Sequence, residues 1–95
     1  EIEISVANAS SKNIKETKTL KLFLKNNGMI EISNNSFSQK YIEDEIKNIW
    51  NQSGYSDILI ICDTKSNSQN LITLMDSIKK LMITKVNFTI KNNVK

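Results

Sequence analysis

The strongest constraint on the fold comes from residues 56–91, where the hydrophobic period of the sequence changes twice. The stretch opens with an apolar run at residues 58–62, which is typical of a short strand covered on both faces. Apolar residues then recur at spacings of three and four, which predicts one face of an α-helix. They are Leu71, Leu74, Met75, Ile78, Leu81 and Met82.

The residues around this helix agree with its two ends. Ser66 followed by Gln69 resembles a capping box at the start, and Lys79 and Lys80 fall in the last turn, where the helix dipole favours cations. Beyond the helix, apolar residues alternate with polar ones, which predicts a strand with one face in water. Its apolar residues are Val86, Phe88 and Ile90. The two strands and the helix between them most simply form a right-handed βαβ unit with parallel strands.

Length and composition restrict the chain to one small domain. Ninety-five residues suffice for a single core, and 39% hydrophobic with 24% charged residues is typical of an ordinary globular domain. No apolar run reaches about 18 residues, and Glu1 does not begin a signal peptide, so no membrane span or leader is predicted here. Since the chain does not begin with Met, we expect that an upstream portion has been removed.

Charge and residue usage weigh against several function classes. The net charge of +3 comes from 13 lysines and no arginine, and nucleic-acid binding is not expected without the planar fork of arginine. There is no histidine, so the usual general base and metal ligand are missing, and neither a metal nor a cofactor is predicted. The single cysteine, Cys62, lies in the apolar run and is expected to be a buried thiol.

The first part of the chain divides into a strand-like segment and a linker. Ile2, Ile4 and Val6 alternate with polar residues but have no nearby partner in the sequence. Residues 7–19 are small and polar, which predicts a flexible linker. We therefore divide the chain into an N-terminal strand and linker at residues 1–18 and a folded domain at residues 19–95.

A β-hairpin and a helix are predicted next. Residues 19–33 alternate around an Asn-Asn-Gly turn, which places five apolar residues on one face. They are Leu20, Leu22, Leu24, Ile30 and Ile32. Ser36 or Ser38 then caps a helix that ends at Gly54, with its apolar stripe at Ile42, Ile46, Ile49 and Trp50. The predicted fold class is α+β, with two layers, a mixed sheet and both helices on one face, in the order β-β-β-α-β-α-β.

Two groups of carboxylates could carry chemistry. Glu43, Asp44 and Glu45 occupy consecutive helical positions, so they fan around the helix and cannot converge on one ion. Asp63 follows the buried strand, where α/β sheets place ligands, but the preferred interpretation is a turn residue that accepts hydrogen bonds from nearby backbone N–H groups. The residues alone therefore leave open a small enzyme around Asp63, and a free-standing basic module that binds a peptide or nucleic acid.

Taken in order, the segments resemble the periplasmic domain of the ExbD/TolR family. The matching features are Gly28 in the hairpin turn, the Asn34-Asn35 turn, Ser38 before the first helix, Cys62-Asp63 at the strand end, Leu74-Met75-Asp76 in the second helix, and Met82-Ile83-Thr84-Lys85-Val86 after it. The first ten residues are similar too, through Ile2, Ile4, Val6, Ala7, Ala9 and Ser10. Met82 replaces a usual glycine and Ala7 a usual proline, so either the second helix ends in another way or Met82 adopts a strained left-handed conformation.

The resemblance implies a role without catalysis. It implies a homodimer on the periplasmic side of the bacterial inner membrane, anchored by an upstream helix that carries a proton-conducting aspartate. Its partners would be ExbB-like and TonB-like proteins for an ExbD-like component, or TolQ-like and TolA-like proteins and peptidoglycan for a TolR-like one. Candidate partner-binding residues are Ile2, Ile4, Val6, Ala9 and Ser10, and a candidate dimer edge is Val86, Phe88 and Ile90.

Overall fold

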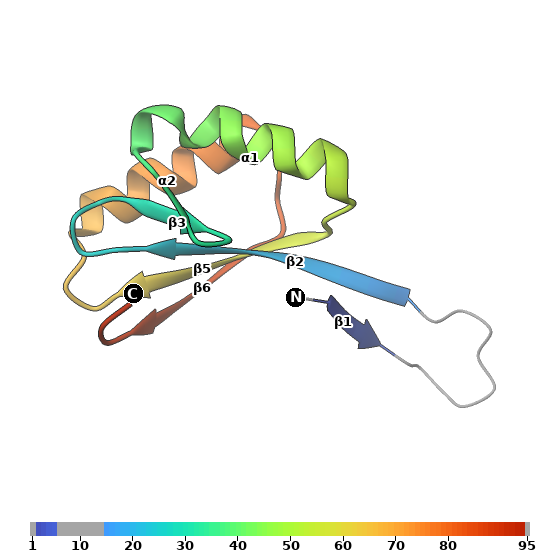
Figure 1. Cartoon of the computed structure of the whole chain (residues 1–95), viewed down its shortest axis with the longest axis horizontal. Coiled ribbons are helices and arrows are strands. Elements are labelled where there is room, and N and C mark those ends of the chain that lie inside the picture. Colours follow the sequence, from blue (N-terminus) through green and yellow to red (C-terminus); the bar gives the residue numbers. More distant parts are fainter. Residues whose placement is uncertain (1, 6–14, 95) are drawn as a thin grey trace.

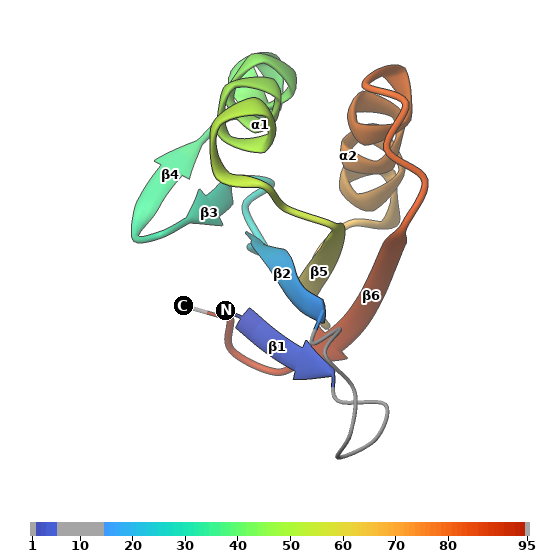
Figure 2. The ribbon, with the colours of Figure 1, turned by 90° about the vertical axis from the view of Figure 1, so that its right-hand side faces the viewer.

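A mixed β-sheet covered on one face by two helices makes up the body of the protein (Figures 1 and 2). The computed structural model describes residues 2–5 and 15–94 of the chain. The elements are β1 (Ile2–Ser5), β2 (Lys15–Leu24), β3 (Ile30–Ile32), β4 (Asn35–Phe37), α1 (Gln39–Ser53), β5 (Asp57–Asp63), α2 (Ser68–Lys80) and β6 (Val86–Lys91). The predicted α+β class, the order β-β-β-α-β-α-β and the placement of both helices on one face are confirmed, and the short strand β4 is added before α1.

The sheet has the strand order β4-β3-β2-β5-β6. The neighbours β2, β5 and β6 run parallel, as the predicted βαβ unit requires, while β3 and β4 add antiparallel strands. Outside this order, β1 pairs antiparallel with the first residues of β2. The β2–β3 hairpin is confirmed, and its turn holds Gly28 at a φ of 87°, where the hydrogen atom of glycine costs nothing sterically.

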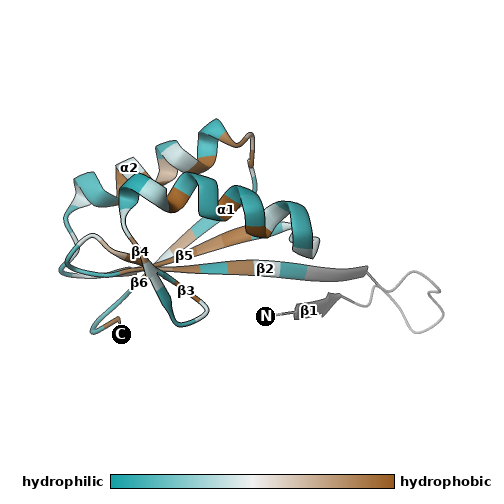
Figure 3. Ribbon diagram, turned by 45° about the horizontal axis from the view of Figure 1, so that its top comes forward, coloured by the Kyte–Doolittle hydropathy of each residue, from teal (hydrophilic) through white to brown (hydrophobic). Residues whose placement is uncertain are grey.

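The core lies between the sheet and the helices, where Figure 3 shows the apolar residues of β2 and β5 beneath α1 and α2. The five predicted inward residues of the hairpin are all buried, because strand periodicity turns alternate side chains to the same face. On the helices, the fully buried large side chains are Ile42, Ile46, Leu74 and Ile78. Ile60 of the central strand belongs to the same cluster.

Helix α1 begins and ends where its sequence predicts. Ser38 is its N-cap residue, without a capping hydrogen bond from the side chain, and Gly54 ends it in the left-handed conformation at a φ of 67°. Ile49 and Trp50 are only half-buried, at the margin of the stripe. Glycine suits position 54 because the left-handed conformation is strained for residues with a Cβ, although a Cβ there would have no neighbouring atom within 4 Å.

The start of helix α2 differs from the prediction. Asn67, not Ser66, is its N-cap residue, and the Asn67 Oδ1 atom accepts a 2.7 Å hydrogen bond from the Gln69 N–H. The capping box of Ser66 with Gln69 is therefore wrong, since asparagine one position later satisfies the free backbone donor equally well. At the other end, Lys79 and Lys80 lie in the last turn as predicted. Met82 follows at a φ of 64°, the left-handed conformation expected where the family has glycine.

Two further differences concern the strands. β2 begins at Lys15, so residues 15–18 belong to a strand and not to the predicted linker. Pairing with β1, which is distant in sequence, supplies backbone partners that local composition could not reveal. The predicted turn at Asn34 is present, with positive φ angles at Ser33 and Asn34, but Asn35 already starts the short strand β4.

Shortening Ile78 tests whether the helix stripe and the central strand share one core. The Ile78→Ala variant should lower the free energy of unfolding by about 2–5 kcal/mol, because it leaves a cavity against Ile60 and Leu74. Urea unfolding followed by circular dichroism measures this change. Ile72, which is 51% exposed on the same helix, is the control, and Ile72→Ala should cost less than about 1 kcal/mol. Equal costs for both variants would contradict the assignment of the core.

Candidate protein interaction surface

The last strand, β6, forms one end of the sheet and is paired only with β5 among the described residues. Its register aligns Phe88 with Ile60 and Ile90 with Cys62, so both side chains lie on the helix side of the sheet, as their alternation predicts. Phe88 is nevertheless 52% exposed and Ile90 57% exposed. The predicted orientation is confirmed, and both side chains remain exposed because the helices do not cover this edge of the sheet.

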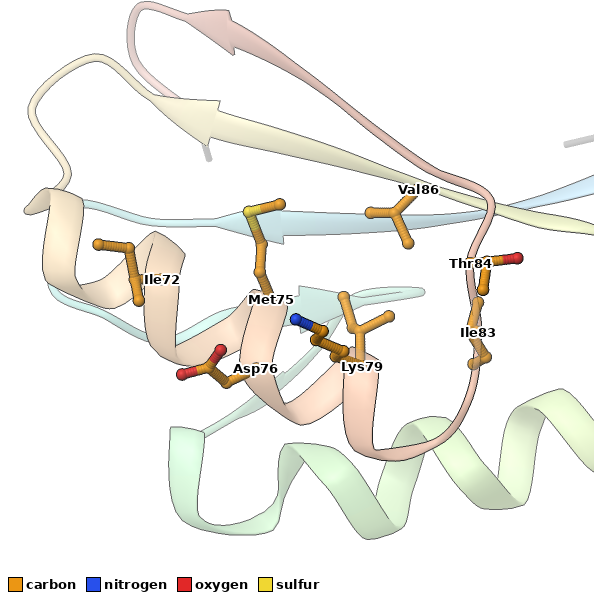
Figure 4. A pocket seen from close by; sticks show the side chains of 8 residues that line it. Ile72, Met75, Asp76, Lys79, Ile83, Thr84 and Val86 are labelled. Carbon is orange, nitrogen blue, oxygen red and sulfur yellow. The ribbon is translucent and has the colours of Figure 1, made fainter.

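A groove of about 550 Å³ opens between α2 and β6 (Figure 4). It is lined by Ile72, Met75, Asp76, Ile78, Lys79, Ile83, Thr84 and Val86. Figure 4 shows Met75 projecting from α2 toward the strands, with Val86 across the groove. The groove is thus walled by a helix on one side and bordered by a strand with an open edge on the other.

Exposed apolar side chains gather around this groove. Ile72 and Met75 project from α2 with 51% and 39% of their surface exposed. Phe88 and Ile90 of β6 are also exposed on the helix side of the sheet, and we call these two residues the apolar strip. Contiguous exposed apolar surface on a small domain marks a place where another molecule binds. The sequence signal was present in the alternation of β6, but alternation cannot reveal that no helix covers the apolar side.

A second exposed feature is the arm formed by β1 and the first residues of β2. The register runs from Ile2↔Lys18 to Ser5↔Lys15, and the arm projects beyond the helices and the rest of the sheet (Figure 1). Of the candidate partner-binding residues, Ile2 and Ile4 lie in this arm, and Val6, Ala9 and Ser10 lie outside the described residues. The partner-binding candidates in β1 and the dimer-edge candidates in β6 do not pair with each other, because β1 pairs with β2 and β6 pairs with β5.

Aromatic residues anchor the base of the arm to α1. The Lys18 Nζ atom donates a 3.2 Å hydrogen bond to the Ser53 carbonyl and lies 4.6 Å from the centre of the Tyr55 ring. Tyr55 in turn stacks on Trp50, with ring centres 6.1 Å apart. Sequence reasoning missed this contact, because residues 18 and 55 are brought together only by the pairing of β2 with β5. It fixes where the arm leaves the body.

Both carboxylate oxygens of Asp63 accept hydrogen bonds from backbone N–H groups. Its Oδ1 atom accepts from the Lys65 N–H at 2.8 Å and its Oδ2 atom accepts from the Val94 N–H at 3.1 Å, while the side chain is only 4% exposed. The carboxylate therefore holds the turn after β5 and the segment after β6 together. The interpretation as a turn residue is confirmed. Among the described residues, no group of three side chains could hold a metal ion.

Removing the Asp63 carboxylate tests this structural role. Asp63→Ala leaves two backbone N–H groups without their acceptor and should lower the free energy of unfolding by about 1–3 kcal/mol. Asp76→Ala, at an exposed position of α2, is the control and should change it by less than about 0.5 kcal/mol. Thermal unfolding of the two variants measures these changes. If Asp63→Ala loses no more stability than Asp76→Ala, the Asp63 carboxylate does not hold the two segments together.

Comparison with known proteins gives one decisive result. The model of the family described as biopolymer transport protein ExbD/TolR matches residues 1–93 of the chain. The chain belongs to the ExbD/TolR family. This confirms the resemblance found in the sequence, and the match includes the arm as well as the body. No curated protein matches the chain.

Membership of the ExbD/TolR family assigns the broad role. The family comprises transport-associated proteins that are anchored in the inner membrane, carry periplasmic domains and transduce energy for biopolymer transport. The members of this family are non-enzymatic proteins. None of the helices in the described part of the chain is long and apolar enough to cross a membrane.

Proposed function

We propose that this chain is the periplasmic domain of an ExbD-like component of an inner-membrane motor driven by the proton-motive force. The domain passes the movement of the motor to a TonB-like protein for transport across the outer membrane. The observation that carries the proposal is the open edge of β6 beside an apolar groove. An upstream membrane helix with a proton-conducting aspartate, together with an ExbB-like protein, completes the motor.

The geometry of β6 suits transmission of a pull. An extended segment that adds to a sheet edge forms a row of backbone hydrogen bonds, and its alternate side chains enter neighbouring pockets. β6 is paired along its whole length with β5, which in turn pairs with β2 over six residue pairs. A load on this edge is therefore shared with the centre of the sheet, because the paired strands carry it together.

The arm supports a homodimer. Two strands without a third strand or a packed helix are marginally stable, and the described part of the arm has no such cover. A second copy can supply the same β1 strand in the same register, which forms identical hydrogen bonds and links the two chains. We therefore propose that Ile2 and Ile4, named above as candidate partner-binding residues, form the dimer through exchange of β1. The β6 edge, named above as the candidate dimer edge, is then the partner surface.

Deleting residues 1–6 tests the exchange of β1. The deletion should weaken self-association by at least about tenfold, or ~1.4 kcal/mol, because β2 loses the strand that a second copy would provide. Sedimentation velocity over a concentration series measures the change. Tyr41→Ala, at an exposed position of α1, is the control and should leave self-association unchanged. An unchanged dimer after the deletion would argue against exchange.

Cross-linking in cells tests the partner. A photoreactive amino acid at Phe88, in the full-length membrane protein, should trap a TonB-like protein, and Phe88→Glu should abolish transport because it places a charge in the apolar strip. The same photoreactive group at Tyr41 is the control and should trap much less. Trapping of a TolA-like protein or peptidoglycan would assign the chain to the TolR-like branch, and trapping of nothing with normal transport in Phe88→Glu would refute the proposal.

A further inference from the structure

We infer that the edge of β6 and the adjoining groove receive an extended peptide in which apolar residues alternate with carboxylate residues. The inference rests on the proposed function for one point only, that this surface receives a segment of another protein. The chemistry of that segment follows from the backbone, the two faces and the charges of β6.

The backbone of β6 leaves hydrogen-bonding groups directed at the open edge. The Lys85 and Lys91 carbonyls accept hydrogen bonds of 2.9 Å from the N–H groups of Ile58 and Thr64. In a parallel ladder, alternate residues of one strand bond to the same neighbour, so the backbone groups of Phe88 and Ile90 point away from β5. An added strand pairs with these groups, whereas a helix laid in the groove would cover them without pairing them.

The side of the sheet that faces the helices selects apolar residues. A strand added to β6 has alternate side chains beside Phe88 and Ile90, because neighbouring strands share the same pleat. Those side chains also border the groove, where Ile72 and Met75 of α2 are exposed. Apolar residues at every second position of the peptide therefore cover the apolar strip and fill the groove.

The opposite side of the sheet selects carboxylates. Lys91 is exposed on this face with Asn87 and Thr89, and its register partner on β5 is Asp63. Lys85, the exposed residue just before β6, continues the same alternation. Neither of these two ammonium groups forms an ion pair with a carboxylate in the described part of the chain. Opposite charges on directly facing residues of paired strands stabilise the pair. The residues of the peptide that lie between its apolar positions therefore complement β6 when they are Glu or Asp.

The same charges disfavour a second copy of β6 as the occupant. A closed two-fold pair of β6 strands runs antiparallel and keeps both helix layers on one side of the sheet. If Phe88 of one copy faces Phe88 of the other, Lys85 of each copy faces Lys91 of the other. Like charges directly opposite each other destabilise a pair of strands. The carboxylates of an acidic peptide have the opposite charge to Lys85 and Lys91 and therefore stabilise the pair of strands.

Two synthetic peptides test this chemistry on the 95-residue chain. The probe is acetyl-Glu-Val-Glu-Leu-Glu-Val-Glu-amide, and the comparison peptide carries Lys in place of each Glu. Titration of the isotope-labelled protein by nuclear magnetic resonance should show the probe shifting signals of β6 and α2 and binding at least about fivefold more tightly than the lysine peptide. The double variant Lys85→Glu with Lys91→Glu should reverse that preference.

One control variant tests whether the charge on β6 or the net charge of the protein sets the preference. A second variant tests whether the groove contributes to binding of the peptides. Lys40→Glu with Lys47→Glu changes the net charge by the same amount at exposed positions of α1 and should leave the preference for the probe intact. Met75→Lys, in the groove, should weaken binding of both peptides. Equal binding of the two peptides, binding away from β6, or an equal effect of the α1 variants would overturn the inference.

Two further results show whether the peptide chemistry or the proposed function is wrong. If a second copy covers β6, the single change Lys85→Glu should strengthen self-association, because it turns both lysine pairs into ion pairs, and this result would overturn the inference. If photo-cross-linking at Phe88 traps a transport partner while the acidic peptide fails to bind, the proposed function stands and the peptide chemistry is wrong.

Discussion

The parallel pairing of β2 with β5 is the contact on which the rest of the structure depends. It aligns residues from Thr19↔Asp57 to Leu24↔Cys62, which places the leucines of β2 beside the apolar face of β5. Both helices bury their stripes on this combined surface. A slip by one residue would turn the leucines to the opposite face, so the register and the core determine each other. The same pairing brings Lys18 to Tyr55 and so fixes the base of the arm.

The open edge of β6 follows from the size of this core. Two helices bury their apolar stripes against the centre of the sheet, and the described residues form no further helix that covers β6. Phe88 and Ile90 therefore remain exposed to water. The core does not depend on these two side chains, because neither belongs to the buried cluster.

Local signals in the sequence were most reliable where one residue decides the backbone conformation. Gly54 ends α1 in the left-handed conformation, and Met82 adopts the same conformation after α2, which was one of the two alternatives for its position. Local signals were less reliable where two neighbouring residues can both serve as the N-cap, as with Ser66 and Asn67 at the start of α2. Both side chains can cap a helix, and a shift of one residue in the loop decides between them.

The sequence by itself determined the class of fold, the hairpin, both helices and the face to which each strand turns its apolar residues, because hydrophobic periods of 2 and 3.6 are local properties. It also determined the family, through motifs that keep their order along the whole chain. Only the tertiary structure decided that β2 extends to Lys15 and pairs with β1, that both oxygens of Asp63 are engaged, and that Phe88 and Ile90 stay exposed. Each of these depends on which distant segments come together, and a periodic pattern shows which side of a strand is apolar but not what covers it.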